Sequence, residues 1–349
     1  MEAAREKSDV IQIMRGLAIV LVLFRHAIAQ VNADVVLDAI EEIIICFHMP
    51  VFFVIAGFLF QKGLTKYIQK GKMNFLVGKA KHLLVPYVFW TILLWLGVQI
   101  ACMSSSAVHA KMTEIGFAPM SIGNLLYGLL TYQVYYTEYL WFLYVLFLFF
   151  VINIIAERAG STMWTLWIWG LIGILSLFVT LPHIIERVMG WGIFFAFGIF
   201  VQKNQKVEKM SGGGGYRACI CLMFLIGVLI RLMGLDSGIT LKLFSVFMQL
   251  DKYLIGFAGV GLVYILAIEL SKINAKKLVK CIGDYSFDIY LMHNPYCVAL
   301  SAMVLNRMLG VPAYISVVAA TIVGVVLPMV ASKLVIRKVK LLSTIMIGR

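Results

Sequence analysis

Ten apolar segments, each long enough to cross a lipid bilayer, follow one another along this chain. A membrane-spanning helix takes about 20 predominantly apolar residues. The chain is 62% hydrophobic and only 13% charged, and a water-soluble domain could not bury so much apolar surface. We therefore predict an all-α fold, a multi-pass membrane bundle of about ten transmembrane helices. The predicted spans are approximately 10–31, 40–60, 83–103, 138–156, 162–181, 187–202, 217–234, 247–270, 282–305 and 311–335.

The basic residues predict the side of the membrane on which each connection lies. The formal net charge is +13, but the lysines and arginines form short clusters between apolar segments and no single patch, which argues against a nucleic-acid partner. By this topology, 23 of the 30 basic residues fall on the side shared by both termini. Loops rich in lysine and arginine stay in the cytoplasm. Both termini are therefore predicted to be cytoplasmic.

Little of the chain remains once the spans are marked, so residues 1–349 are predicted to form a single integral-membrane domain. The connection near 203–216 contains four consecutive glycines, 212–215, and is predicted to be a flexible cytoplasmic loop. The two halves of the chain show no convincing internal repeat, which weakens a transporter built from inverted repeats. The six cysteines show no metal-ligand spacing, and no metal is predicted.

The first predicted span carries ionisable residues at membrane depth, where they are costly and usually functional. It contains Arg15, Arg25 and His26. Arg15 and His26 are eleven residues apart, which is close to three helical turns, so both side chains share a face and lie roughly 16 Å apart along the axis. One helix would thus present a cation near the cytoplasmic face and a titratable imidazole near the outer face.

Two later spans also contain a histidine close to a proline. His48 precedes Pro50 in the second span, at a depth similar to that of His26, and a proline removes one helical hydrogen bond. Two histidines on adjacent antiparallel helices favour acid–base chemistry over a structural kink alone. The ninth span contains Asp288 and His293, which do not share a helix face cleanly. A polar seam between helices explains them as well as a catalytic site does.

Two weaker signals lie at the ends of spans. Lys79 and His82 precede the third span and would suit a phosphate-binding patch, although the cytoplasmic excess of basic residues explains them equally well. Trp141, near the outer end of the fourth span, is a candidate substrate contact or an interfacial aromatic anchor.

Five stretches together resemble the acyltransferase 3 family of membrane acyltransferases, and within it the fucose 4-O-acetylase-like branch. They occur in family order and span nearly the whole chain. The resemblance implies a ten-helix bundle that transfers an acyl group, such as acetyl, from cytoplasmic acyl-coenzyme A to a sugar hydroxyl of a cell-surface or lipid-linked glycan. The stretches are RGLAIVLVLFRH (15–26), FHMPVFFVIAGFL (47–59), KHLLVPY (81–87), LWFLYVL (140–146) and YSFDIYLMHNPY (285–296).

The resemblance also assigns roles to individual residues. The essential intramembrane arginine and histidine of the family match Arg15 and His26, and His48 falls on the second family motif. Many members carry an Arg-x-x-Arg pair before the third span, where this chain has Lys79 and His82 instead, so this part of the coenzyme contact departs from the pattern. Trp141 and His293 are assigned to the acceptor, and acetyl-coenzyme A or another acyl-coenzyme A is the expected co-substrate.

The residues by themselves fit this chemistry. The pantetheine arm of the coenzyme is similar in length to the predicted Arg15–His26 separation, so Arg15 could hold a phosphate while the thioester reaches His26. The imidazole could then take the proton of a sugar hydroxyl. Direct transfer and a covalent acyl-histidine both remain open. The rival hypotheses are a transporter or flippase for a glycan intermediate, with the histidines as a proton relay, and a non-catalytic membrane scaffold. The expected location is the plasma or inner membrane of the cell.

Overall fold

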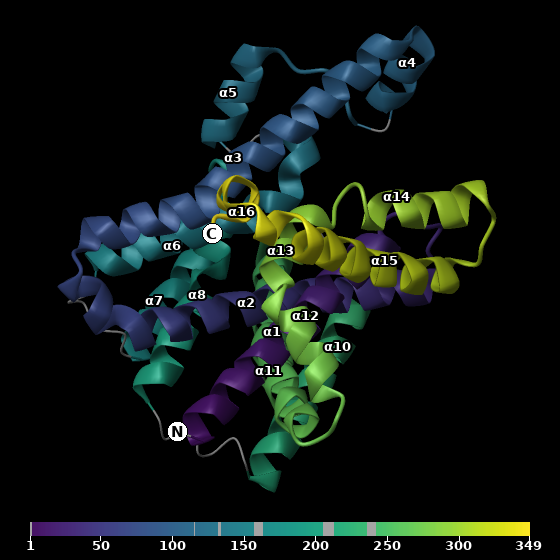
Figure 1. Cartoon of the computed structure of the whole chain (residues 1–349). Helices are drawn as coiled ribbons and strands as arrows, with labels where there is room; N and C mark the ends of the chain where they lie inside the picture. The colour runs from purple at the N-terminus through teal and green to yellow at the C-terminus, as the bar shows by residue number, and fades with distance from the viewer. Residues whose placement is uncertain (1, 115, 132–133, 157–162, 205–212, 236–241) are drawn as a thin grey trace. The chain divides into compact units, whose positions relative to one another are not determined.

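The computed structural model describes residues 2–114, 116–131, 134–156, 163–204, 213–235 and 242–349. Within these ranges the regular elements are all helical (Figure 1). The longer helices are α1 (Glu2–Ile28), α2 (Val35–Gln69), α3 (Lys72–Ser104), α6 (Trp141–Ile155), α8 (His183–Lys203), α10 (Gly214–Leu235), α11 (Lys242–Ser271) and α15 (Ala313–Leu334). The shorter ones are α4 (Ser106–Glu114), α5 (Ile122–Thr131), η1 (Tyr135–Leu140), α7 (Met163–Leu175), η3 (Ser176–Phe178), α12 (Lys276–Asp284), α13 (Ser286–Met292), α14 (Val298–Met303), η4 (Val304–Met308), η5 (Ile336–Lys338) and α16 (Lys340–Ile347).

The predicted membrane bundle is confirmed as an all-helical fold. Eight stretches of described residues are long and apolar enough to span a bilayer, and each overlaps a predicted span. The other two predicted spans correspond to shorter apolar helices, Met163–Phe178 and Val298–Met308. Most of the predicted loop near 203–216 lies outside the described residues.

The ninth predicted span, 282–305, is broken into three helices. α12 ends at Asp284, α13 at Met292, and α14 begins only at Val298. Pro295 explains the second break, because proline has no backbone N–H with which to continue the helical ladder. The sequence predicted one continuous helix over 282–305. The break instead leaves His293 at the end of a helix.

The chain forms two compact units. Unit 1 comprises Met1–Leu64, Ser161–Val179 and Gly190–Lys333, and unit 2 comprises Thr65–Gly160, Thr180–Met189 and Leu334–Arg349. Arg15 and the three candidate histidines of the membrane belong to unit 1, whereas Lys79, His82 and Trp141 belong to unit 2.

Unit 1 is built around α1, which packs against α11, α12, α13 and α14 (Figure 1). Glycines let α1 and α12 approach at backbone distance. A Cβ atom on Gly16 would overlap the carbonyl oxygen of Val279, and one on Gly283 would overlap that of Gln12. Small residues at such crossings are the usual way in which membrane helices pack closely. The crossing lies beside Arg15 and holds α1 against α12 at this point.

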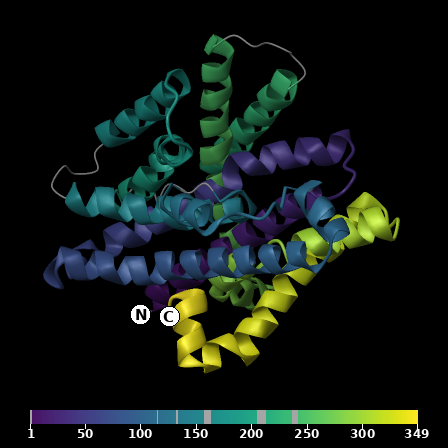
Figure 2. The same ribbon diagram turned by 90° about the horizontal axis from the view of Figure 1, so that it is seen from above.

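In unit 2, α16 lies against α3, as Figures 1 and 2 show. The indole Nε1 of Trp90 donates to the carbonyl oxygen of Met346 at 2.9 Å. Gly348 has φ +67 and packs directly on the backbone of His82, where any side chain would collide. Residues 340–349 are thus held on the first half of α3.

The cytoplasmic location of both termini stays a prediction, with a direct test. Single cysteines placed in the 104–137 segment should react with a membrane-impermeant maleimide added to intact cells, because the basic residues predict that this segment is outside. Cysteines in the 61–82 connection should react with the maleimide only after the membrane has been permeabilised. The reverse labelling pattern would overturn the topology.

Candidate active site

His26 and His293 are in direct contact near the C-terminal end of α1. Their ring centroids are 5.1 Å apart, with the ring planes tilted by 50°. His26 lies in the last turn of α1 and is half-buried, whereas His293 follows α13 and is fully buried. The structure therefore joins two histidines that lie 267 positions apart, because α13 and α14 both pack on α1.

His48 completes a cluster of three imidazoles. It is buried in α2, and it is close enough to His26 for an electrostatic interaction between the two side chains. α2 continues as one helix through Pro50. The histidines of the first two spans thus lie within electrostatic reach of each other, and the direct ring contact of His26 is with His293.

Backbone hydrogen bonds fix the tautomers of the two buried histidines. Nδ1 of His48 donates to the carbonyl oxygen of Ile44 at 2.6 Å, and Nδ1 of His293 donates to that of Tyr290 at 2.7 Å. A carbonyl oxygen can only accept, so Nδ1 carries the hydrogen in each ring. In the neutral imidazoles, Nε2 is then the nitrogen that can accept a proton or a hydrogen bond.

Charged neighbours of the cluster are themselves paired. Nε of Arg25 lies 3.0 Å from Oε1 of Glu41, which ties α1 to α2. The Arg25 guanidinium also interacts electrostatically with His26 and His48. Asp288 is fully buried and accepts a hydrogen bond from Ser332 of α15. This contact ties α13 to α15, so Asp288 forms a polar seam between the two helices.

Arg15 lies on the same uninterrupted helix as His26. It is half-buried, and its Nη1 lies 3.4 Å from Oε1 of Gln12. The unbroken helix preserves the three-turn spacing from which the sequence placed both side chains on one face. α1 therefore carries a cation in its cytoplasmic half, by the predicted topology, and an imidazole in its last turn.

The two predicted phosphate ligands of unit 2 both have partners within their own unit. The ammonium of Lys79 lies 4.4 Å from the ring centroid of Phe150 and 5.5 Å from that of Phe75. Nδ1 of His82 donates to the carbonyl oxygen of Gly348 at 2.9 Å. Both side chains thus take part in the packing of α3.

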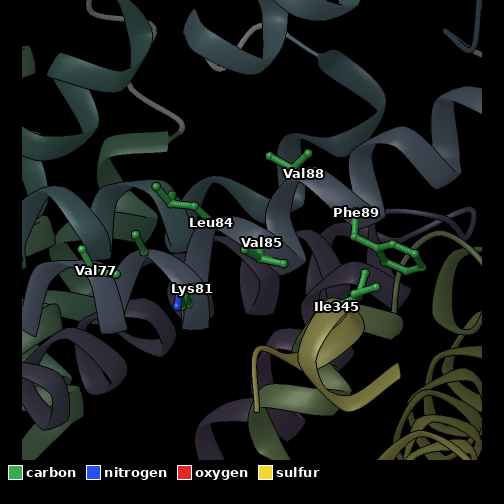
Figure 3. Close-up of a pocket in the computed structure, with 8 residues that line it drawn as sticks. Val77, Lys81, Leu84, Val85, Val88, Phe89 and Ile345 are labelled. Atoms are coloured by element: carbon green, nitrogen blue, oxygen red, sulfur yellow. The ribbon is translucent and has the colours of Figure 1, made fainter. Parts of the chain in front are cut away.

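An apolar groove of about 510 Å³ runs along α3 beside these residues. Figure 3 shows the α3 side chains at its edge, with Ile345 of α16 across from them. Lys81 supplies the one charged group among the lining residues, so the groove offers little polarity for a nucleotide. The lining residues are Val77, Ala80, Lys81, Leu84, Val85, Val88, Phe89 and Ile345.

Trp141 begins α6 and has a charged neighbour. The guanidinium carbon of Arg187 lies 4.7 Å from the Trp141 ring centroid, and Nη2 of Arg187 donates to Oε1 of Glu138 at 2.6 Å. An aromatic ring beside a guanidinium that is itself paired with a carboxylate offers a stacking face with polar groups close to it. This chemistry suits a sugar as well as an interfacial anchor.

Comparison with known proteins decides the family. The profile of the acyltransferase 3 family, described as an acyltransferase domain, matches residues 9–331. The chain belongs to this family. No curated protein and no solved structure gives a significant match. The matched range contains all five stretches from which the resemblance was drawn, so the chain is a membrane acyltransferase, while its place in the fucose 4-O-acetylase-like branch stays a prediction.

The structure adds polar residues to this acyltransferase that the sequence analysis did not single out. Arg231, which falls inside the seventh predicted span, is buried in α10, with its Nε 3.0 Å from Oδ2 of Asp251 in α11. Next to Asp251, the ammonium of Lys252 lies 4.2 Å from the ring centroid of Trp191. Ionisable residues inside apolar spans were the signal that could have identified them.

No metal centre emerges from the part of the chain that the structure describes. In these ranges, no three histidine, cysteine, aspartate or glutamate side chains are grouped so that they could hold a metal ion.

Proposed function

We propose that this acyltransferase moves an acyl group, acetyl in the simplest case, from cytoplasmic acyl-coenzyme A to a sugar hydroxyl of a cell-surface or lipid-linked glycan. The observation that carries the proposal is the contact between His26 and His293 at one end of α1, with Arg15 on the same helix. The family supplies the reaction class. The fucose 4-O-acetylase-like branch and the plasma or inner membrane are the proposed subfamily and location.

His26 is proposed as the general base. A sugar hydroxyl is a weak nucleophile at neutral pH, so a neutral imidazole must take its proton as the oxygen attacks the thioester carbonyl. The new C–O bond forms, the C–S bond breaks, and the departing thiolate takes up the proton from the imidazolium. The products are the O-acyl sugar and coenzyme A with a free thiol.

The other two histidines have roles that follow from their tautomers. Nε2 of His48 and of His293 is the acceptor nitrogen of each ring, so each can receive a hydrogen bond from a sugar hydroxyl. His48 is proposed as the second catalytic histidine, and His293 as an acceptor ligand that also contacts the base. Trp141 is proposed as a further acceptor contact, and Lys79 and His82 as further coenzyme contacts.

Arg15 is proposed to bind a phosphate of the coenzyme, which gives a direct prediction. Arg15→Ala should raise the Kd for acetyl-coenzyme A roughly 10-fold or more, since hydrogen bonds to charged groups are among the stronger ones. Arg15→Lys should fall between Arg15→Ala and the wild type, because lysine keeps the charge but loses the planar fork. Equilibrium binding to purified protein measures both. Arg217→Lys is the matched control, since Arg217 pairs with Glu269 at 2.7 Å. An unchanged Kd in both Arg15 variants would remove Arg15 from the site.

The proposed function is tested by the release of free thiol from acetyl-coenzyme A by the purified protein. Release that depends on an added sugar or glycan fraction, with recovery of the O-acetylated product, is the expected result. A glycan transporter would leave acetyl-coenzyme A intact under every condition. That outcome, with a glycan fraction from the producing cell as acceptor, would contradict the proposal.

A further inference from the structure

Five basic residues lie at the ends of α10, α11 and α12 on the predicted cytoplasmic side of unit 1, and they are not equivalent. Three of them are in ion pairs: Arg217 and Lys272 pair with Glu269, at 2.7 and 3.0 Å, and Lys280 pairs with Asp9. The other two form no ion pair with any residue that the structure describes. These two are Lys276 and Lys277, in the first turn of α12.

The packing of α12 places this first turn beside the part of α1 that precedes Arg15. Gly283 faces Gly16 where the two helices cross, and ten residues further along each segment His293 meets His26. α12 and α13 therefore run along α1 in the same direction. Arg15 is next to Gly16, and Lys276 is seven residues before Gly283, so the two lie roughly 9 Å apart along the helix axes. Arginine and lysine side chains are long enough to close much of this interval.

The two lysines therefore form a cationic site near Arg15 but further toward the cytoplasm. Lys276 is half-buried and Lys277 is exposed, so a ligand from the cytoplasm can reach both. Coenzyme A carries two separate phosphate groupings, a diphosphate next to the pantetheine arm and a monophosphate on the 3′ carbon of the ribose. A donor whose diphosphate meets Arg15 has its ribose phosphate further out.

We propose that Lys276 and Lys277 bind the 3′-phosphate of the acyl-coenzyme A donor. The inference rests on the proposed function and deepens it, because it states which part of the donor this chain recognises and with which residues. Lysine ammonium groups suit a monophosphate, which they bind as point charges with rotatable donors.

The test compares coenzyme A with 3′-dephospho-coenzyme A in equilibrium binding to the purified full-length protein. The wild type should bind coenzyme A roughly 10-fold more tightly, the scale of a lost charged hydrogen bond. The double variant Lys276→Gln, Lys277→Gln should bind both ligands with the weaker affinity. The double variant Lys276→Arg, Lys277→Arg should still bind coenzyme A more tightly than 3′-dephospho-coenzyme A. Lys272→Gln is the matched control, because it removes a nearby charge that is paired with Glu269, and it should also keep the preference.

The outcomes separate this inference from the proposed function. A wild type that binds both ligands equally, or a double glutamine variant that keeps the full preference, overturns the lysine site and leaves the acyltransferase proposal standing. A wild type that binds neither ligand removes coenzyme A as donor and the lysine site with it. A double glutamine variant that loses affinity for 3′-dephospho-coenzyme A as well is damaged beyond this contact and also counts against the inference.

Discussion

Replacing His26 with glutamine is expected to lower the rate of acyl transfer roughly 100-fold or more, the usual scale for the loss of a general base. Glutamine keeps hydrogen-bonding capacity but cannot take a proton. His26→Ala should be at least as inactive. Binding of acetyl-coenzyme A should change little in either variant, because the phosphates are proposed to bind at Arg15, about three helical turns from His26. Initial rates of thiol release at saturating donor measure the effect.

The matched control is His109→Gln, which alters an exposed histidine of α4 and should leave the rate unchanged. A His26→Gln protein that transfers at close to the wild-type rate would show that His26 only positions its neighbours. The base would then have to be His48 or His293, and the same assay on those two single variants would distinguish them.

Valine at Gly16 or at Gly283 is expected to destabilise the protein and abolish activity together. Each new side chain would meet a backbone carbonyl oxygen, of Val279 or of Gln12 respectively, and backbone cannot move aside as a flexible side chain can. Overpacking of this kind costs about 1–3 kcal/mol, and occasionally more. Moving α12 away from α1 also displaces the surroundings of Arg15. Thermal unfolding in detergent and donor binding measure the two effects.

Gly78→Ala provides the comparison, because nothing lies within 4 Å of a Cβ atom at that position of α3. Alanine is a better helix former than glycine by about 1 kcal/mol, so this variant should be as stable as the wild type or more so. Equal stability of the Gly16→Val, Gly283→Val and wild-type proteins would contradict the close α1–α12 crossing.

Much of the fold follows from apolar segment length, because a bilayer imposes a fixed span on each helix. The interpretation of the first span was also accurate, since α1 is one helix that carries both Arg15 and His26. Helical periodicity is enough to place two residues on the same helix. It does not show which other helix touches them, and for that reason the contact between His26 and His293 was not predicted.

The remaining differences have physical causes that a single sequence does not reveal. The ninth span looks continuously apolar, yet Pro295 and the turn at Tyr285 divide it. In the sequence, Arg25 is an intramembrane charge with no evident partner, whereas in the structure it forms an ion pair with Glu41 of the next helix. Likewise, the spacing of Lys79 and His82 did not reveal that Lys79 lies on the Phe150 ring and that His82 bonds to Gly348. These partners are set by tertiary packing.

The most direct test of the central claim is mass spectrometry of surface and lipid-linked glycans from cells that produce the wild-type protein, the His26→Gln protein, or no protein. We predict that one O-acyl group on a sugar is present only with the wild type, and that labelled acetyl-coenzyme A supplies its label when the acyl group is acetyl. Glycans with the same acylation in all three cells would contradict the account.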